Sequence, residues 1–374
     1  PNLMMKYYKN FRISDDENYR MGYINNAPNP KLRWEKTRDV KVALDFGLWK
    51  DRINGIVEAY WRKSKDCVTS EYVPVTTGFF NQSYNTSVLQ NNGVEFSLSV
   101  AVLKSKDYNL SVSANVAWNQ NKLKKYNSPN TSLALDKYVG YPMGAVFSGK
   151  YEGIDPETGM YKFKLRPDAV TNKDGYLREP NNYYYYLGTS VAPFTGGFNL
   201  NFSYKNIGLS VGGSYSVKAK MVDNIESPAG YELLSGSKLE SIPTPHNDLY
   251  RNHLNVKREV RNRWTPENRT GVKYPRLIDA YGKKLGLDLT NPTLTTITRG
   301  ALLEDISYLR INTIALSYSL PQRVLERINF SSAALNLTLN NFFTITKYSG
   351  IDPEVPGATY PVSRSVTIGL NVGF

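Results

Sequence analysis

The carboxyl-terminal residues 362–374 alternate strictly between apolar and small polar side chains. The apolar row is Val362, Val366, Ile368, Leu370, Val372 and Phe374, and only Arg364 interrupts it. Successive side chains of a β-strand point to opposite faces, so this segment has one apolar face and one polar face. Such a strand either buries its apolar face in a soluble core or turns it toward lipid in a transmembrane barrel with a wet lumen.

The same alternation recurs along the chain and predicts about nine strands, most near the length of about 9–11 residues that crosses a membrane at a tilt. The expected strands lie near residues 40–48, 57–61, 94–102, 110–118, 198–204, 209–217, 305–320, 335–345 and 362–374. In the seventh of these, Leu309 and Ile311 fall out of phase with Ile314 and Leu316, which indicates a β-bulge.

The residues between the apolar positions favour the membrane alternative. They are Ser, Thr, Gly and Asn far more often than Lys or Glu, as in a lumen wall and unlike a surface kept soluble by charge. No stretch approaches the roughly 20 apolar residues of a transmembrane helix, so any membrane passage must be made by strands. Aromatic residues near the strand ends fit interfacial girdles, although they are also ordinary β-formers.

Short and long connections alternate along the chain. Residues 50–55, 104–107, 205–208 and 321–330 form short turns, whereas residues 65–91, 122–195, 221–304 and 347–361 form long loops. Outer-membrane barrels have tight periplasmic turns and long outer loops, and compact soluble sandwiches seldom carry several loops of this length. We therefore expect residues 1–38 to be an outer loop segment and residues 39–374 to be barrel with those four long loops outside.

The direction of the strands predicts that this chain is one part of a barrel. If the carboxyl end lies in the periplasm, an odd number of strands places Pro1 outside the cell, whereas single-chain bacterial barrels have an even number. We expect an all-β, antiparallel transmembrane barrel, of which these are the carboxyl-terminal strands.

Composition excludes several functions. The formal charge of +13 lies mostly in turns and polar stretches and accompanies no recognition motif, so we expect no nucleic-acid partner. Cys67 is the single cysteine, which rules out an intrachain disulfide and a multi-cysteine metal site. We also expect no catalytic residues, because no nucleophile elbow or metalloprotease motif occurs.

Motifs along nearly the whole chain resemble the carboxyl-terminal barrel of SusC/RagA-type TonB-dependent outer-membrane transporters. They are NPKLRWEKT at residues 29–37, LDFGL at 44–48, RING at 52–55, NGVE at 92–95, LG at 187–188, PFTGG at 193–197, RWTPEN at 263–268, YLRI at 308–311, NFFTITKYSGIDPE at 341–354 and the terminal Phe374.

The resemblance implies an importer with a 22-stranded barrel, an amino-terminal plug and a SusD-like lipoprotein lid. It also implies energy from TonB through a Ton box, and this chain contains neither plug nor Ton box. The cargo would be an oligosaccharide or a peptide, the location the bacterial outer membrane, and the surroundings outer-membrane lipid. The resemblance implies no cofactor. The alternatives are an independent porin or outer-membrane enzyme, and a soluble, β-rich carbohydrate-binding protein.

The most suggestive binding cluster is a run of four tyrosines. Aromatic rings offer flat apolar faces while their hydroxyls form hydrogen bonds, which suits sugars and peptide backbones. The substrate-contact candidates are Tyr183, Tyr184, Tyr185 and Tyr186, with Tyr141, Trp264 and Tyr348 as weaker companions. Packing of a loop is the alternative role for all of them. Phe374 resembles the terminal aromatic of the outer-membrane assembly signal, or it simply closes the last strand.

Other polar motifs favour ordinary loop structure. His246 and His253 lie in a long polar segment without metal-ligand spacing. GIDPE occurs at residues 153–157 and again at 350–354, and Asp-Pro favours a turn. Residues 172–175 resemble the middle of a calcium loop, but Val170 and Asn181 stand where carboxylates are needed, so we expect no metal.

Overall fold

The computed structural model describes residues 11–13, 22–24, 26–79, 81–126, 138–157, 159, 161–168, 183–222, 261–272, 299–356 and 360–374. The chain divides into two compact units, one of residues 1–143 and 196–198 and the other of residues 144–195 and 199–374. Among the helices in these ranges, none is long and apolar enough to cross a membrane.

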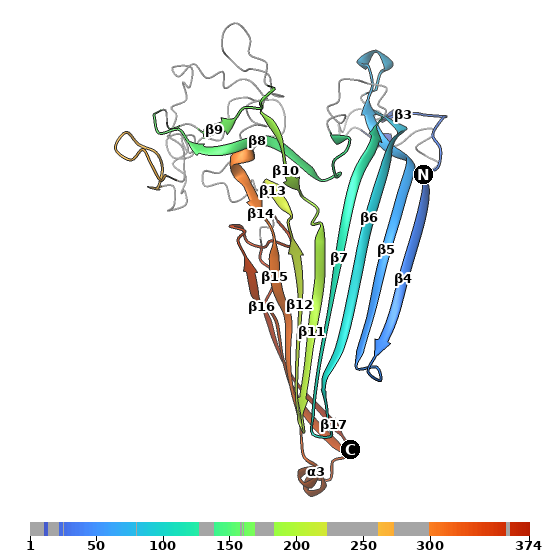
Figure 1. Cartoon of the computed structure of the whole chain (residues 1–374), viewed down its shortest axis with the longest axis vertical. Coiled ribbons are helices and arrows are strands. Elements are labelled where there is room, and N and C mark those ends of the chain that lie inside the picture. Colours follow the sequence, from blue (N-terminus) through green and yellow to red (C-terminus); the bar gives the residue numbers. More distant parts are fainter. Residues whose placement is uncertain are drawn as a thin grey trace. The chain divides into compact units, whose positions relative to one another are not determined.

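The first unit contains four long antiparallel strands that lie side by side (Figure 1). They are β4 (Lys36–Leu48), β5 (Ile53–Tyr72), β6 (Asn81–Lys104) and β7 (Tyr108–Tyr126). The short strand β3 (Asn26–Ala27) pairs in parallel with β6, β1 (Phe11–Ile13) pairs with β2 (Gly22–Ile24), and the 3₁₀ helix η1 (Val75–Thr77) joins β5 to β6.

The register of the first unit separates apolar from polar rows. Val42 pairs with Ala59, Ala59 with Val94, and Val94 with Trp118, whereas the next row is Lys41, Tyr60, Gly93 and Asn119. Side chains of one row share a face, because paired residues of neighbouring strands point the same way. The alternation in the sequence therefore becomes an apolar face and a polar face.

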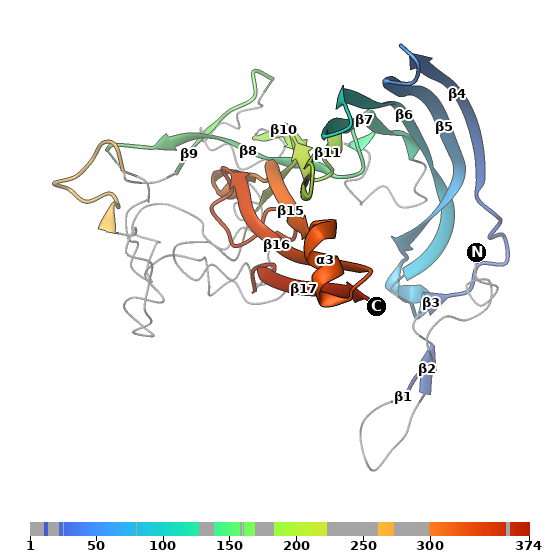
Figure 2. The same ribbon diagram turned by 90° about the horizontal axis from the view of Figure 1, so that it is seen from below.

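The second unit holds the carboxyl-terminal strands, seen from the turn end in Figure 2. In spatial order they are β17 (Ser365–Gly373), β16 (Ser332–Thr346), β15 (Tyr308–Ser319), β12 (Ile207–Val217) and β11 (Phe194–Tyr204). A separate sheet has the order β10 (Tyr184–Thr189), β8 (Ala145–Ile154), β9 (Tyr161–Lys164). Strands β13 (Lys220–Val222) and β14 (Leu303–Asp305) pair with each other, and the 3₁₀ helix η7 (Arg299–Leu302) precedes β14.

The second unit has the same two-faced register. One row is Ile207, Tyr318, Leu335 and Leu370, and the adjacent row is Gly208, Ser317, Asn336 and Gly369. The apolar row is exposed: Ile368 and Leu370 are 73% and 66% accessible. A soluble sandwich would bury these side chains, since exposed apolar surface of this extent marks contact with lipid or a partner. Within the second unit, this apolar row is therefore not covered by a protein core.

Two strands extend beyond the expected boundaries. β5 continues to Tyr72 and β6 begins at Asn81, so both lie partly within residues 65–91, where the sequence predicts a loop. Apolar alternation stops near Asn91 and Asn92, but the backbone pairing of an antiparallel hairpin does not need apolar side chains. The strands leave the apolar belt while remaining paired.

The turn expected at residues 321–330 contains the helix α3 (Gln322–Ile328). Pro321 precedes it with an extended backbone, and Asn329 ends it in the left-handed conformation at φ 56°. Leu325 is the buried residue of this helix, and its carbonyl accepts the Phe330 amide at 3.1 Å. The helix explains why this turn is longer than the others.

Candidate functional site

A β-bulge at Asn312 decides which side chains of β15 reach the polar face. Thr313 pairs with Gly212 and Asn340, whereas Ile311 pairs with Gly213 and Phe343, so the register shifts between them. The shift places Arg310 in the row of Ser214 and Thr344, on the polar face, and turns Leu309 and Ile311 to the apolar face. The predicted bulge is confirmed, and its consequence is the position of Arg310.

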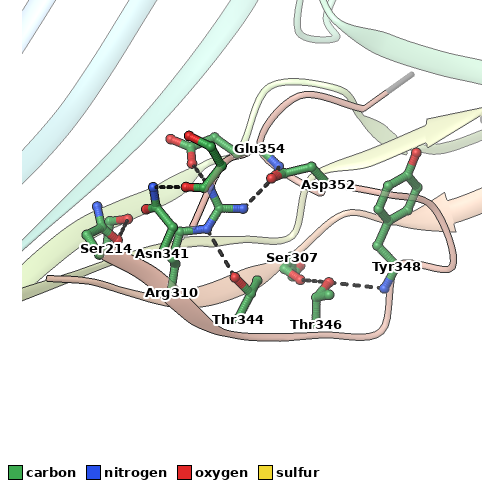
Figure 3. A network of polar contacts seen from close by, with 11 residues as sticks. Ser214, Ser307, Arg310, Asn341, Thr344, Thr346, Tyr348, Asp352 and Glu354 are labelled. Atoms are coloured by element: carbon green, nitrogen blue, oxygen red, sulfur yellow. Dashed lines mark hydrogen bonds and ion pairs between the residues drawn. The ribbon is translucent and has the colours of Figure 1, made fainter. Parts of the chain in front are cut away.

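All three guanidinium nitrogens of Arg310 have acceptors (Figure 3). Nη2 donates to Asp352 Oδ1 and Nη1 to Glu354 Oε2, each at 2.6 Å, and Nε donates to Thr344 Oγ1 at 3.2 Å. The guanidinium also lies over the Tyr308 ring, 5.5 Å from its centroid. Two strands and one loop therefore meet at a single buried cation, and we call Arg310, Thr344, Asp352 and Glu354 the arginine clamp.

The two carboxylates of the clamp differ in surroundings. Asp352 is buried, whereas the Glu354 side chain is about half exposed. Burial acts to raise the pKa of Asp352, but the Arg310 guanidinium and the Glu354 amide outweigh it and hold that pKa below its ordinary value. Asp352 is therefore ionised at neutral pH and carries the charge that compensates Arg310.

A second contact fastens the start of the same loop. Thr346 Oγ1 donates to the Ser307 carbonyl at 2.8 Å and accepts the Tyr348 amide at 3.0 Å (Figure 3). Tyr348 is 7% exposed and packs with Ala219 and Ile306. Loop residues 347–354 are thus held at both ends, and the ring of Tyr348 serves as a packing residue in this structure.

The repeated GIDPE motif forms the same turn twice. The Glu157 amide donates to Asp155 Oδ1 at 2.8 Å, and the Glu354 amide donates to Asp352 Oδ1 at 2.9 Å. These are Asx turns, so the turn predicted from Asp-Pro is confirmed. At the first copy the Pro156 carbonyl accepts the indole of Trp264 at 2.9 Å, and Trp264 is 6% exposed.

Three of the four tyrosines lie in β10, on both faces of its sheet, and Tyr183 directly precedes the strand. Tyr184, Tyr185 and Tyr186 pair with Gly149, Ser148 and Phe147 of β8, so neighbouring rings point in opposite directions. The Tyr185 hydroxyl donates to the Leu165 carbonyl at 2.8 Å, and Tyr186 is 41% exposed. Burial raises the pKa of Tyr183. The cluster is therefore divided, with Tyr186 presenting the most accessible ring.

The other two candidate residues, Tyr141 and Phe374, lie outside the tyrosine-rich strand and the arginine clamp. The backbone of Tyr141 bonds to Leu123 and Tyr138 in the first unit, and its side chain is partly exposed. Phe374 is 91% exposed and meets Phe330 edge to face at a centroid distance of 5.1 Å. Substrate contact by the tyrosines and Trp264, and the assembly role of Phe374, stay predictions. The burial of Trp264 and Tyr348 favours packing for those two.

Two predictions fall outside the described residues, namely the histidines at 246 and 253 and the calcium-like stretch at 172–175. Within the ranges that the structure describes, no group of three or more His, Cys, Asp or Glu residues has the geometry of a metal site.

The polar face of the first unit explains the NGVE motif. The Tyr60 ring lies against Gly93, where a Cβ would come within 2.3 Å of the ring, and the Tyr60 hydroxyl donates to Asn119 Oδ1 at 3.1 Å. Beside it, Lys41 pairs with Glu58 at 2.5 Å. Gly93 therefore lets a side chain of β5 reach β7 across β6.

The NPKLRWEKT motif fastens the chain to the extended hairpin of β5 and β6. Asn29 Nδ2 donates to the Ser83 carbonyl at 2.7 Å, Glu35 Oε1 accepts the Val68 amide at 2.7 Å, and Leu32 is buried. The motif thus has a structural role in this unit.

Sequence reasoning missed the arginine clamp. YLRI and KYSGIDPE both carry the family resemblance, but a one-dimensional pattern does not pair Arg310 with Asp352. The available signals were the phase break around Ile311 and a lone arginine in an otherwise apolar and small-residue strand.

The sequence is similar to those of known receptors along almost the whole chain. The chain is 25% identical to TonB-dependent receptor P26 of Formosa agariphila over 94% of its own length and 36% of that receptor. It is also 25% identical to TonB-dependent receptor SusC of Bacteroides thetaiotaomicron, over 93% of the chain and 33% of SusC.

Solved structures are similar to this chain over almost its whole length as well. The RagAB peptide transporter superposes with a TM-score of 0.74 at 25% identity, covering 99% of this chain and 39% of that one. The RagAB peptide importer in the closed-closed state gives 0.75 at 26% identity, covering 98% and 39%. The chain is similar to SusC/RagA-type TonB-dependent receptors along almost its whole length. No protein-family model matches it.

The similarity to these receptors indicates the environment of the two-faced strands. SusC/RagA-type receptors are outer-membrane β-barrels, so the exposed apolar rows face lipid and the polar rows face the lumen. The chain spans about a third of the length of the curated receptors that it matches, namely 36% of P26 and 33% of SusC.

Proposed function

We propose that this chain forms barrel wall and outer loops of an outer-membrane importer that takes up oligosaccharides or peptides with energy from TonB. The observation that carries the proposal is the pairing of exposed apolar rows with small polar rows, as between Leu370 and Gly369, on strands shared with SusC and RagAB. Residues 1–38 and the four long loops would lie outside the cell, and residues 39–374 would otherwise form barrel.

The cargo class rests on the relatives. One related structure is described as a peptide transporter, which favours peptides, whereas an oligosaccharide remains compatible with the tyrosine-rich outer strand. We propose that Tyr186 and its neighbours contact the cargo and that a SusD-like lipoprotein closes over the loops. A lid would exclude water from the bound cargo and so strengthen its hydrogen bonds.

The mechanism in this proposal is gated passage without covalent chemistry. The lumen rows of Ser, Thr, Asn and Gly hydrogen-bond weakly to a polar solute and leave space beside it. The arginine clamp would hold the loop that follows β16 in a fixed position at the strand end. A fixed loop presents its contacts with less loss of conformational entropy on binding.

The test is uptake by cells that express the receptor from its native gene. Labelled peptide mixtures and labelled oligosaccharides are supplied separately, with the gene or TonB deleted in parallel strains. The proposal expects that uptake of one class requires both the gene and TonB. Uptake that persists without TonB would support a porin and contradict the proposal, and release of cleaved cargo would support an outer-membrane enzyme.

The lid is tested separately by affinity purification of the receptor. A copurified surface lipoprotein, whose removal lowers uptake, is the expected result. Isolation of the receptor without one, in detergent that preserves uptake on reconstitution, would contradict that part of the proposal.

A further inference from the structure

The turn end of the second unit carries an apolar stripe beside a basic stripe on one short helix. Along α3, Val324 and Ile328 are four residues apart and both exposed, and Arg323 and Arg327 are also four apart and exposed. Residues at this spacing lie one above the other on a helix. The exposed surface of α3 is therefore amphipathic, while Leu325 faces the protein.

The apolar stripe continues into the lipid-facing side of the strands. Phe374 is in phase with Leu370 and Val372, and its ring meets Phe330, which directly follows α3. Figures 1 and 2 both place α3 beside the carboxyl end of the chain. Ile207, Tyr318 and Leu335 form the exposed row next to this end. An amphipathic element at such a position lies at the boundary between hydrocarbon and headgroups.

The cations here are available to a ligand. Within the described part of the chain, neither Arg323 nor Arg327 forms an ion pair or a side-chain hydrogen bond. On the neighbouring turn, Lys205 lies 5.3 Å from the centroid of the Tyr204 ring, and both side chains are exposed. The turns of the first unit also combine basic and aromatic residues, with Lys50 and Arg52 near Trp49, and Lys104 and Lys106 near Tyr108, and each contains one aspartate, Asp51 or Asp107.

We propose that α3 and the turn of Tyr204 and Lys205 bind the headgroup of an anionic phospholipid in the periplasmic leaflet. The arginines and Lys205 contact the phosphate, and Val324, Ile328 and Phe374 lie against the acyl chains. Charge complementarity selects this occupant, because a neutral protein surface would cover the apolar stripe and leave two arginines without partners. The proposal requires the membrane location and is independent of cargo and TonB.

The experiment titrates the purified native receptor in neutral detergent with dioctanoyl phosphatidylglycerol, and in parallel with dioctanoyl phosphatidylcholine. Bound lipid is counted by native mass spectrometry. We expect tighter binding of phosphatidylglycerol, weakened by salt, and a loss of about fivefold for each arginine removed in R323Q and R327Q. K162Q/K164Q removes two exposed lysines of β9 and serves as the control with the same loss of charge.

Each other outcome overturns the proposal. These outcomes are equal binding of the two lipids, unchanged binding by R323Q/R327Q, and an equal loss in K162Q/K164Q. Competition by inorganic phosphate as strong as that by the lipid would show a phosphate site and not a lipid surface. V324S/I328S keeps the arginines, and it must weaken lipid binding while leaving the heat-modifiable folded band on gels unchanged.

Discussion

Arg310 and Asp352 are 42 residues apart in the sequence, and Nη2 and Oδ1 are 2.6 Å apart in the structure, with both side chains buried. The pair joins the polar face of β15 to the loop after β16. A buried charge pair adds little net stability compared with apolar packing, but removal of one partner leaves the other uncompensated. The position of the loop therefore depends on this contact.

Asp352→Asn should release the loop. We expect the free energy of opening residues 347–354 to fall by about 3 kcal/mol, because Arg310 then lacks its buried counter-ion. Hydrogen exchange of the native receptor, followed peptide by peptide, measures this opening. Glu354→Gln is the matched control and should cost less than about 1 kcal/mol, since its side chain is half exposed. If the two variants lowered the free energy of loop opening equally, Asp352 would not be the more important partner of Arg310.

The clamp should also respond to acid. Since the pKa of Asp352 in the folded protein is below its ordinary value of 3.8, its stabilising contribution is present above about pH 4 and is lost as the pH falls through the folded value. A spin label on Val355→Cys should report an ordered loop at pH 5–8 and a mobile one once the pH falls below the lowered pKa of Asp352. In a D352N background the label should be mobile at every pH. An unchanged acid transition in that background would assign it to another group.

Gly93→Ala should disturb the wall of the first unit, because a Cβ there meets the Tyr60 ring at 2.3 Å. We expect a loss of about 1–3 kcal/mol as the ring moves and its bond to Asn119 breaks. Urea titration of the heat-modifiable band measures the loss. Gly369→Ala is the control, since its nearest neighbour would be Asn336 Cβ at 4.0 Å. Without the Tyr60 ring the added Cβ meets no obstacle, so the double variant Tyr60→Ala/Gly93→Ala should lose less stability than the sum of the two single variants. A loss equal to that sum would contradict the contact between residue 93 and the Tyr60 ring.

Deletion of Asn312 should remove the bulge and leave Arg310 on the polar face. Without Asn312, Thr313 and Ile311 become adjacent, as their partners Gly212 and Gly213 already are, so residues 308–311 keep their phase. We expect near-normal amounts of folded receptor in outer-membrane fractions. If the deletion instead turned Arg310 to lipid, the arginine would cost about 2–4 kcal/mol at mid-membrane depth and the amount of folded receptor would fall. Asn312→Gly keeps the residue count and should also assemble normally.

Tyr186→Ala should weaken cargo uptake, because its ring is the most exposed of the four and lies on the opposite side of β10 from Tyr185. We expect an increase of about tenfold in the cargo concentration for half-maximal uptake, in line with the loss of one aromatic contact of 1–1.5 kcal/mol. Tyr185→Phe removes only the hydroxyl bonded to Leu165 and should change uptake little. Normal uptake by Y186A would remove the tyrosine from the proposed cargo contacts.

The sequence predicted the strands and their faces because side-chain alternation is a local property of an extended chain. It also indicated the bulge near Ile311, where the apolar phase changes. The extension of β5 and β6 past the apolar belt was missed, since paired strands in water need no alternation. The opposite orientation of neighbouring tyrosines on β10 was also missed, because the sequence did not predict a strand there.

The sequence by itself determined the two-faced strands and the family resemblance, since both are written in residue order. Only the tertiary structure decided that Arg310 meets Asp352 and Glu354, that Tyr60 reaches Asn119 across Gly93, and that Trp264 and Tyr348 are buried. These contacts join residues distant in the chain. Their formation depends on strand register and on the path of the loops, which no local pattern specifies.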